Sequence, residues 1–171
     1  MGRFSQSTTT KGGVMSVLKR ITQALCITLF ALFAVQVLAQ SYGPSVGIDD
    51  AKKMAAAALA EAKKNNWNVA IAIVDTHGFL VYFEKIDDTQ TASVQVAIDK
   101  AKSAAIYRRP TRAFEEGMVK GRVAILGLTG ATPITGGLPI MKGGKVLGGI
   151  GVSGVTSDQD EQCAKAGLGA M

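Results

Sequence analysis

The first 39 residues carry the pattern that most constrains the fold, because it indicates that they are not part of the folded domain. All four basic residues of this segment lie at or before Arg20, no acidic residue occurs, and an uncharged apolar run covers residues 21–38. A basic stretch, an apolar stretch and the small residues Val37 and Ala39 at the −3 and −1 positions are typical of a secretory signal peptide. We therefore expect residues 1–39 to be cleaved after Ala39 and the protein to be periplasmic or secreted.

The apolar run also allows a second interpretation, a retained membrane anchor, since about 18 apolar residues can just span a bilayer. Gln23, Thr28 and Gln36 dilute the apolar character of the run. A cleavage site also stands where an anchor needs a linker. Both observations favour cleavage.

The charge of the folding part is much smaller than that of the whole chain. Removing 39 of the 171 residues leaves 132, enough for one domain with its own core. The formal charge falls from +6 to +2, because 15 of the 19 basic residues remain against 13 acidic ones. Aromatic residues do not interleave with basic ones, so we expect no nucleic-acid binding, and membrane contact only during export.

One cysteine, Cys163, remains, and we expect a buried, inert thiol without an internal disulfide.

Hydrophobic periodicity in the remaining chain predicts helices alternating with strand pairs. Residues 40–48 lack periodicity and carry turn formers, so they are interpreted as a linker before a domain at 49–171. A helix with a mostly alanine apolar face is predicted from Asp49 to Lys64. Bulky and small apolar residues alternate along 69–74, which indicates a strand covered on both faces.

The rest of the chain repeats this order of helices and hairpins. The expected elements are a turn at 75–78, a strand at 79–86, a helix from Thr91 or Ser93 to just before Pro110, a short helical turn capped by Thr111, an irregular glycine-bearing connection, a hairpin of strands 138–141 and 146–152 with Gly143-Gly144 at its tip, and a helix at 157–166. Ser157 and Asp160 have capping-box spacing at the start of that helix. The order indicates an α+β domain with an antiparallel sheet and helices packed on it.

His77 is the residue with the clearest potential for metal chemistry, since it is the single histidine of the chain. At a hairpin tip its imidazole could be exposed, and neutral imidazole binds haem iron well. The alternative is a solvent-facing turn histidine with no role, because turns accept histidine readily. Asp75, two residues earlier, could orient the imidazole or simply fix the turn.

Basic side chains after the second strand and the second helix form the next group of candidates. Lys85 precedes two acidic residues, and Arg108 and Arg109 stand near Arg112. Arginines at a helix end could hold carboxylates such as haem propionates, or could be a solvated terminus favoured by the helix dipole.

Other motifs give weaker signals. No His, Cys or carboxylate cluster has zinc-ligand spacing. The glycines from Gly148 to Gly151 lie inside a predicted strand, so we interpret them as allowing close approach in a sheet rather than phosphate binding. Ser153 stands between glycines, but a serine nucleophile needs a converging histidine and acid, and a role in fixing the strand exit is favoured.

Several segments together resemble one known family. They are Val74-Asp75-Thr76-His77-Gly78-Phe79-Leu80-Val81, Lys85-Ile86-Asp87-Asp88, Ala97 to Lys100-Ala101, Gly136-Gly137-Leu138-Pro139-Ile140 and Gly148-Gly149-Ile150-Gly151-Val152-Ser153-Gly154 with Gln159-Asp160. In this order they are similar to the GlcG/HbpS-like haem-binding family, also found as the C-terminal domain of some corrinoid adenosyltransferases. The likeness extends from about Asp49 to Ala170.

The resemblance implies profilin-like α-β-α layers with a five-stranded antiparallel sheet, a homo-oligomer, and haem or a related tetrapyrrole as cofactor in some members. Two departures stand out. The family usually has arginine before Met-Asp-Gly where this chain has Lys85-Ile86-Asp87-Asp88, and commonly a small residue before the turn glycine where this chain has His77. The resemblance assigns no axial ligand, and no catalytic residue is predicted.

Three functional hypotheses follow. The first is an exported haem- or tetrapyrrole-binding carrier, buffer or sensor, with His77 as iron ligand and with Lys85, Arg108 and Arg109 as contacts for the propionates. The second is an oligomeric accessory subunit that binds a small organic acid or a partner protein, and the third is oxidative haem degradation.

Overall fold

The computed structural model describes residues 41–171, so the expected signal peptide, its cleavage after Ala39 and the alternative anchor lie outside the described residues. The elements are β1 (Ser41–Tyr42), α2 (Ile48–Lys64), β2 (Ala70–Val74), β3 (Leu80–Lys85), α3 (Ala92–Tyr107), α4 (Arg112–Val119), the 3₁₀ helix η1 (Val123–Gly127), β4 (Gly137–Lys142), β5 (Lys145–Ser153) and α5 (Ser157–Leu168). None of the helices between residues 41 and 171 is long and apolar enough to cross a membrane.

The five strands form one mixed sheet built around β5. β4 pairs with β5 on one side, β2 and β1 pair with different stretches of β5 on the other, and β3 pairs with β2. All pairings are antiparallel except β1 with β5, which is parallel. The predicted α+β class and five-stranded sheet are therefore confirmed, and the expectation of a wholly antiparallel sheet is corrected at β1.

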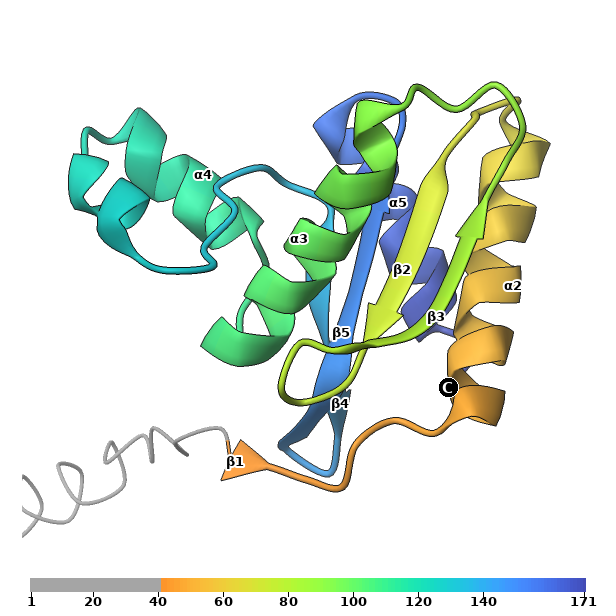
Figure 1. Cartoon of the computed structure of the whole chain (residues 1–171), viewed down its shortest axis with the longest axis horizontal. Helices are drawn as coiled ribbons and strands as arrows, with labels where there is room; N and C mark the ends of the chain where they lie inside the picture. Colours follow the sequence, from red (N-terminus) through yellow and green to blue (C-terminus); the bar gives the residue numbers. More distant parts are fainter. Residues whose placement is uncertain (1–40) are drawn as a thin grey trace, which may run out of the picture. The chain divides into compact units, whose positions relative to one another are not determined.

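The helices cover both faces of the sheet (Figure 1). α2 and α5 pack against one another and on one face, while α3 lies on the other face. β2 is buried along its whole length, as its alternating apolar sequence predicted. Ile71 and Ile73 enter the core beneath α2 and α5, whereas Ala70 and Ala72 face α3.

The glycines of β5 let α3 lie very close to the sheet, as their position inside a strand predicted. A Cβ atom added to Gly149 would overlap the backbone carbonyl of Ala101, and one added to Gly151 would overlap that of Ala97. The α3 side of these residues is also alanine, with Ala97, Ala101 and Ala105 fully buried. Small residues on both partners therefore set the distance between helix and sheet.

Three local features differ from the sequence-based expectations. The segment predicted as a linker contains β1, which pairs with β5 at Lys145. A two-residue strand is too short to show periodicity, so the pattern could not reveal it. The Thr111 side chain does not cap α4, because its buried Oγ1 accepts a hydrogen bond from the N–H of Gly137 at 2.9 Å.

The capping box of α5 is shifted by one residue from the predicted pair Ser157 and Asp160. Thr156 is the N-cap, and Oε1 of Gln159 accepts a hydrogen bond from the N–H of Thr156 at 3.2 Å. The carboxylate of Asp160 is instead buried and bonded to Lys100. Both spacings satisfy the same three-residue rule, so the sequence alone could not separate them.

Candidate functional site

The turn that carries His77 is held by Asp75. Oδ1 of Asp75 accepts hydrogen bonds from the N–H groups of His77, at 2.8 Å, and of Phe79, at 2.9 Å. Gly78 has a φ of +84°, which a glycine adopts without strain. Of the two roles considered for Asp75, the structure shows the fixing of the turn, because its contacts are to backbone N–H groups and not to the imidazole.

The imidazole of His77 is exposed, and a pair of hydroxyl groups orients it. Thr76 Oγ1 lies 3.2 Å from Nδ1 of His77, and Ser45 Oγ lies 3.0 Å from the same Thr76 oxygen. Thr76 is itself buried. Metal-ligating histidines are commonly oriented by a hydrogen bond at the nitrogen that does not face the metal. Here that contact engages Nδ1 and leaves Nε2 as the candidate ligand atom.

The last turns of α3 lie beside the His77 turn. A Cβ atom on Gly78 would come within 2.7 Å of Lys102 Cγ and 3.4 Å of Ile106 Cγ2. Lys102 is exposed, so its ammonium group reaches solvent next to this turn. Phe79 and Leu80 follow the turn with 72% and 49% of their surface exposed. Sequence reasoning missed Lys102, because only the packing of the hairpin on α3 brings it to His77.

The predicted arginines separate in the structure. Arg108 ends α3 in a left-handed conformation, and its guanidinium lies over the ring of Tyr42, 5.4 Å from the centroid. The Tyr42 hydroxyl donates to the carbonyl of Ile106 at 2.8 Å. Arg108 therefore lies at the end of α3 that also contacts the His77 turn.

Arg109 and Arg112 lie in other surroundings. The Arg109 guanidinium lies over the ring of Phe114 on α4, 5.5 Å from the centroid. Arg112 forms ion pairs with Glu161 and Asp158 of α5. The three arginines thus do not form a single anion-binding cluster.

Lys85 lies at the opposite end of β3 from His77. Lys85 pairs with Ala70, at the end of the hairpin away from the turn. Because a strand rises about 3.3 Å per residue, roughly 17 Å of strand separates Lys85 from Leu80, which follows the turn. The Lys85 side chain borders a shallow hollow of about 210 Å³ with Lys63, Glu84 and Asp87 among its neighbours. The structure does not bring Lys85 to the His77 turn.

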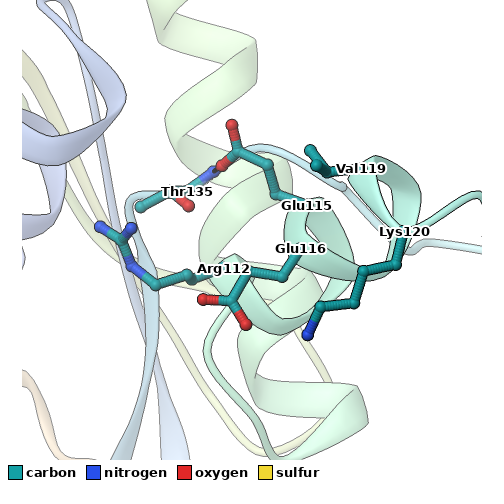
Figure 2. A pocket seen from close by; sticks show the side chains of 6 residues that line it. All are labelled: Arg112, Glu115, Glu116, Val119, Lys120 and Thr135. Atoms are coloured by element: carbon teal, nitrogen blue, oxygen red, sulfur yellow. Dashed lines mark hydrogen bonds between the residues drawn. The ribbon is translucent and has the colours of Figure 1, made fainter.

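A second hollow, of about 260 Å³, lies along α4 (Figure 2). Its lining residues are Arg112, Glu115, Glu116, Val119, Lys120 and Thr135. Oε2 of Glu115 accepts a hydrogen bond from the N–H of Thr135 at 2.7 Å, which ties the helix to the segment before β4. Sequence reasoning missed this hollow, because its two sides come from segments about twenty residues apart with no motif in common.

Ser153 has the structural role that the sequence favoured. It is buried, and its Oγ donates a hydrogen bond to Oγ of Ser93 at 3.3 Å. This contact ties the end of β5 to the start of α3.

Lys100 forms a buried ion pair. Its Nζ donates to Oδ2 of Asp160 at 2.8 Å and to the carbonyl of Val152 at 3.0 Å, and only 1% of the residue is exposed. Burial raises the pKa of Asp160, and the hydrogen bond and charge of Lys100 act against that rise. Lysine within an alanine face at helical spacing was the available sequence signal for such a pair.

The fold and this arrangement define a small, three-layered α+β domain with a histidine presented at a hairpin turn. A model of the family described as "Haem degrading protein HbpS-like" matches residues 46–169. The chain therefore belongs to the HbpS-like family, as its motifs indicated.

Individual relatives agree with this assignment. Protein GlcG of Escherichia coli K12 is 38% identical over 103 residues, which cover 60% of this chain and 77% of GlcG. The crystal structure of a double mutant of Streptomyces reticuli HbpS superposes with a TM-score of 0.71 at 28% identity, over 77% of this chain and 90% of HbpS. The structure described as a PduOC:heme complex shares the fold with a TM-score of 0.68 at 23% identity, over 74% of this chain and 95% of PduOC.

Proposed function

We propose that this protein is an exported haem- or tetrapyrrole-binding protein that acts as a carrier, buffer or sensor. The family description refers to haem, and PduOC, which shares the fold, was crystallised with haem. The observation that carries the proposal to this chain is the exposed His77 imidazole, held through Nδ1 by Thr76 on a fixed turn.

The surroundings of His77 suit a porphyrin. Phe79 and Leu80 offer exposed apolar surface directly after the turn, where a flat apolar ring could be covered. Lys102 and Arg108 place cations at the adjoining end of α3, and cations of this kind pair well with propionate carboxylates. We therefore favour Lys102 and Arg108 for the propionates, over Lys85 and Arg109, which lie elsewhere.

The chain has a single histidine, so one copy supplies one imidazole. Haem held by His77 alone would be five-coordinate, and a second imidazole would have to come from another copy. The optical spectrum separates these arrangements, because six-coordinate and five-coordinate haem iron differ in their Soret and visible bands.

We propose that the protein forms a homo-oligomer, and the segment from α4 to η1 supports this. The segment extends away from the sheet and its covering helices (Figure 1). Val119, Val123 and Leu126 on this segment are 84%, 67% and 68% exposed. Apolar side chains gathered on one projecting segment are typical of an association surface. A partner protein on the same segment is the alternative, and light scattering of the purified protein distinguishes the two.

The N-terminal residue of the mature protein tests export. We expect the protein expressed from the full sequence in a Gram-negative host to appear outside the cytoplasm with Gln40 as its first residue. A chain of 171 residues recovered in the membrane fraction would instead support the anchor interpretation.

A hemin titration of protein beginning at Gln40 tests the main proposal. The expected result is a Soret band that saturates at a fixed ratio of haem to chain. A spectrum that never saturates would overturn haem binding. Adding peroxide or a reductant to the loaded protein then tests degradation: binding alone predicts loss of the band no faster than for free hemin, and faster loss would favour the enzymatic hypothesis.

A further inference from the structure

The hollow along α4 contains a buried hydroxyl group without a partner. Thr135 is 1% exposed. Among the described residues, its Oγ1 is the one buried side-chain nitrogen or oxygen atom that makes no hydrogen bond. The residue borders the hollow beside the carboxylate of Glu115 (Figure 2). Buried hydroxyl groups are nearly always hydrogen-bonded in native proteins, so this atom needs an explanation.

The backbone around Thr135 is fixed from both sides. Its own N–H donates to Glu115, and the N–H of Gly137 donates to the buried Thr111 Oγ1 at 2.9 Å. The hydroxyl therefore cannot find a partner by moving the segment without breaking these bonds. A ligand in the hollow would supply the missing partner.

The charges that line the hollow favour a cation. The guanidinium of Arg112 is already matched, because Nε and Nη2 both donate to Glu161, at 3.1 and 2.9 Å, and Nη2 also pairs with Asp158. Of the remaining charged groups, Glu115 and Glu116 are negative and Lys120 is positive. The charged groups that remain therefore give the hollow a net charge of −1.

We propose that this hollow binds the ammonium group of a small primary amine. An ammonium group has three N–H donors, and the hollow offers the Thr135 hydroxyl and the carboxylates of Glu115 and Glu116 as acceptors. A short alkyl chain would lie against the methylene groups of Arg112. The volume of about 260 Å³ suits a ligand of only a few heavy atoms. This site is separate from the His77 turn and independent of haem binding.

Three probes with one carbon frame test the proposal: propylammonium chloride, 1-propanol and sodium propionate, each at matched ionic strength. In ¹⁵N-correlated NMR spectra of the protein beginning at Gln40, we expect saturable shifts of the Thr135 and Glu115 amide signals with propylammonium. Shifts of the same size with sodium chloride, or equal binding of the alcohol or the acid, would overturn the proposal.

A substitution of Thr135 and a matched control test whether the Thr135 hydroxyl binds the amine. Thr135→Val removes the hydroxyl but keeps the shape of the side chain, so it should raise the Kd for propylammonium about tenfold. It should also raise the Tm of the ligand-free protein, because a buried unpartnered group is removed. Thr129→Val, on an exposed residue outside the hollow, is the matched control and should change neither value.

Lys120→Gln removes the cation at the exposed rim and should lower the Kd for propylammonium several-fold, whereas it would weaken the binding of an anion. This variant does not depend on the folding of a buried substitution, so the proposal stays testable if Thr135→Val does not fold. Weaker amine binding in Lys120→Gln, or unchanged binding in Thr135→Val, would contradict the assigned role of the hollow.

Discussion

The two faces of the sheet are covered in opposite ways. On the large-residue face, beneath α2 and α5, the strands contribute side chains such as Ile71, Ile73 and Ile150. On the small-residue face, beneath α3, they contribute mainly alanines and glycines, and Lys100 of α3 forms its buried ion pair with Asp160. The candidate residues for haem, His77, Lys102 and Arg108, lie at the end of α3. We infer that both faces contribute to stability, and that the small-residue face also positions the site through the close contact of α3 with the sheet.

Lys100→Met tests the small-residue face most severely. Removing one partner of a buried ion pair leaves a buried carboxylate, and we expect a loss of about 3–5 kcal/mol in the free energy of unfolding. Urea denaturation measures this loss. The matched double variant Lys100→Met/Asp160→Asn removes both charges and should recover most of the stability.

The Lys100→Met variant should also show a distinct pH dependence. The pKa of Asp160 is raised by burial in the native protein, and loss of Lys100 removes the hydrogen bond and the charge that oppose that rise most strongly. A carboxyl group whose pKa is higher in the folded state favours folding while protonated, so the deficit should be smallest at about pH 4 and grow as the pH rises. A deficit independent of pH would mean that the lost packing, and not the charge, is responsible.

Gly151→Ala should disturb the same face by overlap. The new Cβ atom meets the backbone of Ala97 and Ala101, which cannot rotate away as a side chain can, so we expect a loss of about 3 kcal/mol, at the upper end for overpacking. Haem affinity should fall as well, because α3 must shift. Gly127→Ala is the control, since nothing lies within 4 Å of its added Cβ atom. A fully stable Gly151→Ala protein would contradict the close packing of α3.

Ile71→Val tests the large-residue face and should have a smaller effect. Deleting one buried methylene group typically lowers the free energy of unfolding by about 1 kcal/mol. Denaturation with and without hemin separates stability from binding. We expect haem affinity to stay unchanged, and a parallel loss of affinity would show that both faces control the site.

Glu161→Gln should have the smallest effect, and the difference from the wild type should be present at neutral pH and disappear at acid pH. Burial tends to raise the pKa of Glu161, but Arg112 and Lys165 outweigh it and hold the pKa below its usual value. Such a carboxylate stabilises the fold above its unfolded pKa, and this contribution is lost as the pH falls through the folded pKa. The variant should therefore lose less stability than the wild type between neutral and acid pH, measured by Tm.

Sequence patterns predicted the regular elements well, because each long element has its own period. The alanine face of α2 and the alternation in β2 are read from neighbouring residues. The patterns missed β1, whose pairing with β5 depends on residues about a hundred positions away. The buried position of Cys163 was predicted and is confirmed, and burial raises the pKa of its thiol to about 12.

The candidate site was predictable only in part, for the same reason. The turn around His77 follows from Asp75 and Gly78, which act within five residues. The contacts of Ser45 with Thr76 and of Gly78 with Lys102 join distant segments, so no local pattern contains them. Lys85 and His77 lie at the two ends of the same hairpin, and their nearness in sequence hid their separation in space.

Parallel hemin titrations of His77→Ala and Lys85→Ala test the central claim most directly. Both substitutions remove one exposed side chain from the same hairpin, so general effects on folding are matched. We predict that His77→Ala abolishes the saturable Soret band, or shifts it with a large loss of affinity, while Lys85→Ala titrates like the wild type. An unaltered spectrum and affinity in His77→Ala would contradict the account.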